Sequence, residues 1–351
     1  MGQNPPIQQG NDQIPFQQNI PPQYYPTMPY KMPMQQNLPP IDQKKIDDDA
    51  AALRKAMKGF GTDKKSIINI VANSTNRERL AMIESFRRQF SRDLISDLKS
   101  ELSGNFKDTI KVLFKDTIEY DCYTLEKSLS DSFSSKDETI IEILVTRSNY
   151  YINLIKQRYQ EMYKKTLEDH LKLIYREFDT IKSSLLSLCS GNKQEHSNAF
   201  IYDCTTKAEM LYRAGEKRLG TDEEIFYDII MKASPEELRM INDIYIQKHK
   251  HDLAKAINNE FSGLDKTLLK TIVRFAVDPI GFYARKVNKA VKGLGTDNTT
   301  LIRMIVTRNE IGMPQIREAY KRLFNKDMIK DIEDDTSGDY RTLLVKLASR
   351  K

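Results

Sequence analysis

One short string of residues occurs three times in this chain of 351 residues and fixes its organisation. It reads KGFGTDKK at 58–65, KRLGTDEE at 217–224 and KGLGTDNT at 292–299. Gly220 and Gly295 lie 75 residues apart, and Gly61 and Gly220 lie 159 residues apart, about twice that interval. A long period of this kind indicates an array of similar units, and it constrains the fold more than any single motif does.

The doubled interval predicts a further copy near residue 134. The segment 125–144 reads LEKSLSDSFSSKDETIIEIL, and its KDETIIEIL parallels TDKKSIINIV of the first copy. The glycines are absent from it. We therefore expect four units of roughly 70–80 residues, each with about five short helices, and a longer join near residues 188–205.

The periodicity of the apolar residues is helical. Leu80, Ile83 and Phe86 recur three residues apart and are followed by Phe90 and Leu94, which forms a stripe with a period near 3.6. Such patterns begin near Ile46, and no convincing alternating run favours a strand. The chain is therefore predicted to be all-α.

The first 40 residues differ in kind. They hold ten of the thirteen prolines and many Gln and Asn residues, and their only charged residues are Asp12 and Lys31. So little apolar surface cannot offset the entropy of ordering, so residues 1–45 are predicted to be a disordered arm. The arm is either a solvated tail or a docking segment for a protein partner, because PPQYYPTMPY at 21–30 combines polyproline character with tyrosines.

Composition excludes several classes. No run approaches the ~20 apolar residues that span a bilayer. Cys122, Cys189 and Cys204 are an odd number without metal spacing, which is typical of reduced thiols in a cytoplasmic protein. The net charge of +6 suits an anionic partner. Lys and Arg are nevertheless spread among acids along the chain, so no specific nucleic-acid site is expected.

The sequence also lacks the pattern of an enzyme. His249 and His251 lie two residues apart, so they would not share a helix face. No hydrolase triad order, zinc-protease motif or dinucleotide fingerprint is present. The prediction is a binding protein, and a calcium-independent helical-repeat scaffold that acts through its N-terminal tail is one alternative.

A turn alone would account for one copy of the repeated loop. The glycines permit positive φ, and the threonine is expected to cap the following helix. In the copy at 217–224, Thr221 and Glu224 are predicted to form a capping box.

A distant acid changes this interpretation. An acidic residue follows the last loop glycine by 40 residues in each intact copy, and a serine follows that acid two residues later. The acids are Glu101, Glu260 and Asp335. The matching segment of the second unit, 167–180, has lost the acid–x–Ser–Gly pattern together with the loop glycines. Loop and acid therefore serve one site.

A hard cation explains this pairing. Ca²⁺ takes six to eight oxygen ligands and often mixes carbonyls, water and one carboxylate. A glycine-rich turn can direct several carbonyls at one point, and the acid completes the site. Because a single carboxylate leaves the ion positively charged, a lipid phosphate could join its coordination shell.

These motifs resemble those of the annexins, and the resemblance covers about residues 46–350. It is carried by the repeated loop, the acid 40 residues later, ALRKAMKGFGTD at 52–63 and DDTSGDYRTLLVKL at 334–347. The resemblance implies four five-helix repeats in a curved disc, with calcium loops on its convex face. It also implies Ca²⁺-dependent binding to anionic, phosphatidylserine-like phospholipid membranes by a cytoplasmic protein that becomes peripheral on them when calcium rises.

The resemblance implies particular ligands. The site of repeat 1 would use the carbonyls of Met57, Gly59 and Gly61 with the Glu101 carboxylate. The site of repeat 3 would use the carbonyls of Gly215, Arg218 and Gly220 with the Glu260 carboxylate. The site of repeat 4 would use the carbonyls of Val291, Gly293 and Gly295 with the Asp335 carboxylate. The second repeat is predicted to be calcium-silent at this type of site. The expected boundaries are 1–45 for the tail, 46–117, 118–190 and 276–351 for repeats 1, 2 and 4, and 191–275 for the join with repeat 3.

Overall fold

The structure, a computed structural model, describes residues 40–59, 61–130, 137–293 and 295–350. Within these ranges every regular element is a helix, which confirms the all-α prediction. The predicted disordered arm lies outside them, apart from its last six residues. Helix α1 begins inside that segment, at Gln43, because the Asp42 side chain accepts a hydrogen bond from the Lys45 amide at 3.1 Å and caps the helix.

In these ranges, twenty helices form four groups of five. The first repeat has α1 (Gln43–Ala56), α2 (Lys64–Asn73), α3 (Asn76–Phe90), α4 (Leu94–Glu101) and α5 (Gly104–Leu113). The second has α6 (Thr117–Ser130), α7 (Asp137–Thr146), α8 (Asn149–Tyr163), α9 (Leu167–Ile174) and α10 (Asp179–Cys189). The third has α11 (Ile201–Ala214), α12 (Glu223–Lys232), α13 (Pro235–His249), α14 (Leu253–Glu260) and α15 (Gly263–Val277). The fourth has α16 (Pro279–Val291), α17 (Asn298–Arg308), α18 (Met313–Phe324), α19 (Met328–Asp335) and α20 (Gly338–Ala348).

The repeats share details that a sequence search for motifs does not reveal. The fourth helix has eight residues in all four repeats. The third helix is followed each time by a non-glycine C-cap residue with positive φ, between 52° and 66°. These cap residues are Ser91, Lys164, Lys250 and Asn325.

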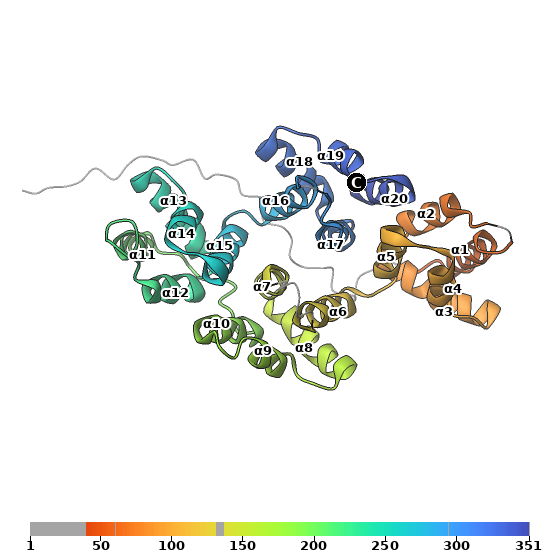
Figure 1. The fold of residues 1–351 in the computed structure, drawn as a ribbon, viewed down its shortest axis with the longest axis horizontal. Helices are drawn as coiled ribbons and strands as arrows, with labels where there is room; N and C mark the ends of the chain where they lie inside the picture. The colour runs from red at the N-terminus through yellow and green to blue at the C-terminus, as the bar shows by residue number, and fades with distance from the viewer. Residues whose placement is uncertain (1–39, 60, 131–136, 294, 351) are drawn as a thin grey trace, which may run out of the picture.

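Two hydrophobic cores hold the four repeats together. One core combines repeats 1 and 4 and includes Leu53, Phe86 and Leu344. The other combines repeats 2 and 3 and includes Tyr159 and Tyr245. Figure 1 shows the resulting arrangement, in which repeats 1 and 3 lie at the two ends and repeats 2 and 4 lie between them.

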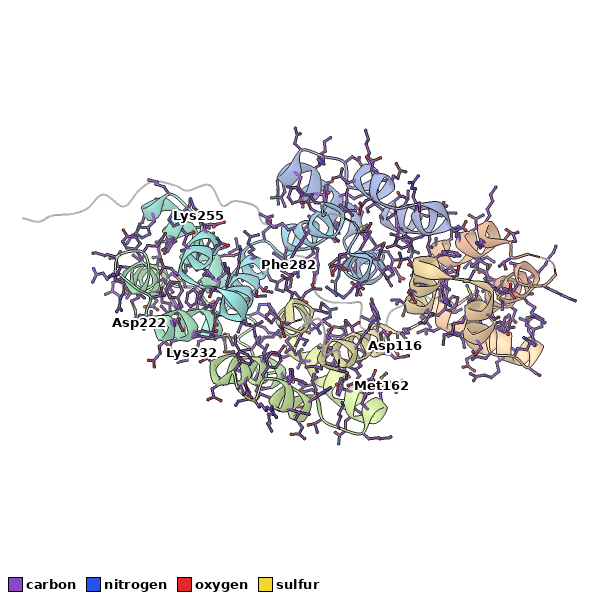
Figure 2. The ribbon with its side chains drawn as sticks, viewed as in Figure 1. Asp116, Met162, Asp222, Lys232, Lys255 and Phe282 are labelled. Carbon is purple, nitrogen blue, oxygen red and sulfur yellow. The ribbon has the colours of Figure 1, made fainter. Side chains whose placement is uncertain are left out.

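Aromatic residues join the two cores. Phe275 on α15 packs against both of them, and its ring lies 5.7 Å from that of Phe282 on α16. Phe282 marks the junction of repeats 3 and 4 in Figure 2. The junction is therefore closed by apolar contact.

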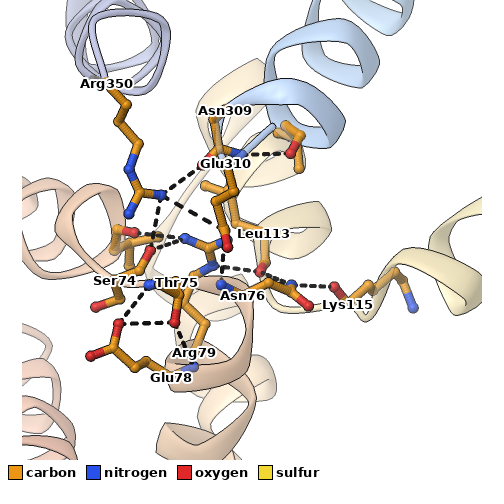
Figure 3. Close-up of polar contacts among 12 residues, drawn as sticks. Ser74, Thr75, Asn76, Glu78, Arg79, Leu113, Lys115, Asn309, Glu310 and Arg350 are labelled. Carbon is orange, nitrogen blue, oxygen red and sulfur yellow. Dashed lines mark hydrogen bonds and ion pairs between the residues drawn. The ribbon is translucent and has the colours of Figure 1, made fainter. Parts of the chain in front are cut away.

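A buried arginine ties repeat 1 to repeat 4 (Figure 3). Arg79 donates to the Leu113 carbonyl at 2.8 Å and to the Ser74 carbonyl at 2.5 Å, which satisfies the ends of two helices. It also pairs with Glu310 of repeat 4 at 2.8 Å, while Arg350 donates to the Ser74 carbonyl of repeat 1 at 3.2 Å and to Asn309 at 2.7 Å. The last residues of the described chain thus close onto the first repeat.

A second buried pair joins repeats 2 and 4. Glu142 is fully buried and accepts from Arg303 at 2.9 and 3.1 Å, and Lys286 lies 3.2 Å from the same carboxylate. Burial alone would raise the pKa of Glu142, but the charges of Arg303 and Lys286 outweigh it and lower this pKa to about 2. The contribution of the pair to stability is therefore complete above pH 4.5 and is lost as the pH falls towards 2.

Breaking this pair from one side should be more harmful than removing it whole. Glu142→Gln leaves the Arg303 charge buried, and we expect a loss of roughly 3–5 kcal/mol in the free energy of unfolding. The double variant Glu142→Leu/Arg303→Met should cost clearly less than the sum of its single changes. Urea denaturation at pH 7 measures both quantities, with the exposed pair Glu84–Arg87 as a control that changes stability by less than about 1 kcal/mol. If the loss in the double variant equalled the sum of the losses in the two single variants, Glu142 and Arg303 would not be coupled.

Candidate metal centres

The three intact loops are closed by the same backbone hydrogen bond. In each, the aspartate of the Gly–Thr–Asp string donates its amide proton to the carbonyl of an alanine at or near the end of the repeat's first helix. These bonds are Asp63 to Ala56 at 2.9 Å, Asp222 to Ala214 at 2.7 Å and Asp297 to Ala290 at 2.9 Å. The glycine before the threonine has φ of 90°, 78° and 84° in Gly61, Gly220 and Gly295. Such values favour glycine, because side chains with a Cβ rarely adopt them.

The structure brings each predicted acid to its loop through the loop threonine. Thr62 donates its hydroxyl proton to the Glu101 carboxylate at 2.6 Å, and Thr221 donates to the Glu260 carboxylate at the same distance. Thr296 instead donates to the backbone carbonyl of Asp335 at 2.8 Å. Each acid is the last residue of its eight-residue helix, so loop and acid form one unit although about 40 residues separate them.

The threonine does not cap the next helix, so that prediction is wrong. The N-cap residue is the following aspartate, and Asp63 accepts from the Ser66 amide at 3.0 Å. The Ser66 hydroxyl and amide also lower the pKa of Asp63. The predicted Thr221–Glu224 capping box is wrong as well, since Asp222 occupies the N-cap position of α12 and makes no side-chain cap bond. The reason is that the threonine hydroxyl is committed to the acid.

In the third loop, the glycine Gly215 has negative φ and lies in close contact with Glu260. Gly215 has φ of −119°, and a Cβ at this position would lie 3.0 Å from Cγ of Glu260 and 3.2 Å from the Phe226 ring. A side chain at this position would crowd the acid, and the predicted ligands Gly215 and Glu260 lie side by side. The Gly215 carbonyl accepts from the Arg218 amide at 2.9 Å, which leaves one of its lone pairs for another partner.

The acid beside the fourth loop has an unsatisfied carboxylate oxygen. Oδ2 of Asp335 is buried and has no hydrogen-bond partner, and the same is true of the Tyr340 hydroxyl. Burial, with the neighbouring charges of Asp335 and Asp297, raises the pKa of Tyr340. A buried carboxylate oxygen without a partner is costly, so this atom fits a bound cation.

The remaining predicted ligands are backbone carbonyls of the same loops. Met57 follows α1 as its C-cap residue, Gly59 has φ of 111°, and Val291 is the last residue of α16. In the described parts of the chain, no three His, Cys, Asp or Glu side chains gather at one point. The predicted ligand sets contain one carboxylate each and would not form such a group.

The second repeat lacks the acid at the corresponding position. Its loop, residues 131–136, lies outside the described residues. Its fourth helix, α9, ends on Ile174, which stands where the other repeats have Glu or Asp. The hydroxyl of Tyr175, the next residue, donates to Asp137 at the start of α7. Neither this substitute bond nor the threonine bonds were predicted from the sequence, although the threonine recurs in all three intact loops.

Comparison with known proteins decides the family. The family model described as Annexin matches residues 48–113, 120–175, 206–272 and 282–347. The chain belongs to the annexin family. As a family, annexins bind phospholipid in a calcium-dependent manner and are generally non-enzymatic.

Individual annexins agree in sequence and in structure. Human annexin A7 is 39% identical over 305 residues, a match that spans 86% of this chain and 61% of annexin A7. Human annexin A4 is 37% identical and is covered over 93% of its length, by 86% of this chain. Chicken annexin V in complex with Zn²⁺ superimposes with a TM-score of 0.82 at 33% identity, covering 90% of this chain and 97% of that one. A calcium-bound annexin (Sm)1 superimposes with a TM-score of 0.74 at 27% identity, covering 89% of this chain and 92% of that one.

In the part of this annexin that the structure describes, no helix is long and apolar enough to cross a membrane.

The contact between Gly215 and Glu260 can be tested by crowding it. Gly215→Ala places a methyl group against the Glu260 side chain, so we expect a loss of roughly 1–3 kcal/mol in the free energy of unfolding. The loss should shrink when Glu260→Ala is already present, because the nearest atoms are then gone. Urea denaturation of the two single variants and the double variant measures the coupling. An equal loss in both backgrounds would show that the two residues do not touch.

Proposed function

We propose that this annexin binds anionic phospholipid membranes in a calcium-dependent manner through the loops of repeats 1, 3 and 4. The observation that carries the proposal is the hydrogen bond between loop threonine and terminal acid, which recurs in all three loops. It places an acid beside a glycine-rich backbone in three repeats of one chain. The protein would act in the cytoplasm and would not be an enzyme.

The residues present fit a calcium ion. The ligands would be carbonyl oxygens and one carboxylate per site, and the unsatisfied Oδ2 of Asp335 supports this assignment most directly. Bound Ca²⁺ would supply positive charge and coordination positions for the phosphate oxygens of a lipid headgroup. The protein fixes the carbonyls by the loop-closing amide bonds and holds the acid by the threonine.

The loop surfaces suit an anionic membrane. Lys58, Lys217 and Lys292 are exposed, one in each loop, so they attract anionic headgroups. Leu219 at the tip of the third loop is fully exposed. An apolar side chain at this position is suited to the interface between headgroups and acyl chains.

Calcium dependence is the first test. We expect the protein to co-sediment with vesicles of phosphatidylserine and phosphatidylcholine when Ca²⁺ is present, and to remain in the supernatant when a chelator is added. Vesicles of phosphatidylcholine alone test the need for negatively charged lipid, and they should bind much less protein. Equal pelleting with Ca²⁺ and with chelator would sink the proposal and favour the calcium-independent scaffold.

The three acids should set the calcium requirement. Glu101→Gln/Glu260→Gln/Asp335→Asn removes the carboxylate ligands, so the calcium concentration for half-maximal vesicle binding should rise by roughly tenfold or more. A matched control, Asp108→Asn/Glu161→Gln/Glu333→Gln, removes three exposed charges outside the loops. Circular dichroism should show unchanged helicity in both variants. If the two variants had the same calcium midpoint, the assigned carboxylates would not be ligands.

A further inference from the structure

Repeat 2 exposes an apolar surface at the place where the other repeats have their acids. Leu173, Ile174 and Phe178 are 62%, 43% and 53% exposed, and we call them the repeat-2 apolar patch. They lie at the end of α9 and at the N-cap position of α10. Large apolar side chains grouped on a surface mark an interaction site more often than scattered ones do.

The repeat-2 apolar patch occupies a position that is polar elsewhere. The fourth helices have equal length, so their last two residues can be compared directly. They are Ser100–Glu101, Asn259–Glu260 and Asp334–Asp335 in repeats 1, 3 and 4, and Leu173–Ile174 in repeat 2. Two polar residues, one of them the acid, are thus replaced by two apolar ones.

The connection that follows is also altered. Two residues separate the fourth and fifth helices in repeats 1, 3 and 4, but four residues, 175–178, separate them in repeat 2. The Phe178 amide donates to the Tyr175 carbonyl at 3.1 Å, which forms a tight turn with Phe178 on its outside. Phe178 stands where the other repeats have serine before their fifth helix.

The turn is held firmly in its place. Tyr175 is buried, and its hydroxyl bond to Asp137 fastens the end of α9 to the start of α7. The threonine bonds fasten the fourth helix to the same region in the other repeats. Because the four repeats share one arrangement, the repeat-2 apolar patch faces the same side as the three loops.

The charges beside the patch balance one another. Lys172 pairs with Asp169 at 3.3 Å, and Arg176 lies 3.5 Å from Glu177. A partner recognised by charge would therefore find little there. The patch is suited to an apolar environment that adjoins the surface on which the loops act.

We propose that the repeat-2 apolar patch inserts into the phospholipid membrane, as a contact that needs no cation and replaces the site that repeat 2 has lost. This inference rests on the proposed function, because the three loops must first bring the face to the membrane. Three partly inserted side chains cannot hold a protein of this size alone, since even one myristoyl chain anchors only marginally. They strengthen binding once the loops are docked.

Tryptophan fluorescence tests the insertion directly, because the natural chain contains no tryptophan. Phe178→Trp should show a blue-shifted emission and quenching by brominated acyl chains when Ca²⁺ and phosphatidylserine-containing vesicles are present. Leu219→Trp reports on the third loop in the same way. Tyr202→Trp is the negative control, because Tyr202 is 81% exposed at the opposite end of α11, about 18 Å along the helix from that loop.

The outcomes separate the two proposals. A shift at positions 178 and 219 but not at 202 supports insertion. A shift at 219 alone overturns the insertion and leaves the proposed function standing, whereas failure of all three variants to bind vesicles with Ca²⁺ overturns both. In addition, Leu173→Ser/Ile174→Ser should weaken vesicle binding at saturating Ca²⁺ by roughly tenfold, while Tyr202→Ser should not. Unchanged binding of Leu173→Ser/Ile174→Ser would also overturn the insertion.

Discussion

The hydrogen bond from the loop threonine to the residue that ends the fourth helix organises each intact repeat. It connects two segments that lie about 40 residues apart and fixes the position of the acid relative to the loop glycines. The geometry of the loop then follows from the bond. The aspartate takes the N-cap position of the next helix because the threonine is engaged, and a Cβ on Gly215 would crowd Glu260. The site is thus part of the fold and does not depend on one flexible segment.

Three such sites can act together only if the repeats are held in a fixed relation. The apolar cores join the repeats in two pairs, 1 with 4 and 2 with 3. Ion pairs between repeats make this packing more specific. Arg79 with Glu310 closes repeat 1 on repeat 4, and Arg303 with Glu142 joins repeat 4 to repeat 2. A buried ion pair adds little net stability, but it penalises any arrangement that separates its charges. The cores and these pairs together hold the repeats, and with them the three loops, in a fixed relation.

Much of the fold and of the site could be predicted from the sequence, because both repeat. The period gave four units, the apolar stripe gave helices, and the constant distance from Gly61 to Glu101 linked a loop to an acid. What could not be predicted depends on contacts between side chains. A threonine before a helix is a good cap by propensity, yet tertiary contact with the acid prevailed. The αL caps Lys164 and Lys250 carry no sequence signal, since lysine has no preference for positive φ.

The degenerate second repeat has a different meaning once its side chains are placed. Loss of the glycines and of the acid predicted a repeat without a cation site, and loss alone would leave ordinary polar residues behind. Leu173, Ile174 and Phe178 stand there instead, exposed and on an anchored turn. Packing within the described residues leaves these side chains in contact with water, and a second apolar surface would remove them from it. The membrane that we propose for the three loops offers such a surface without any further ligand.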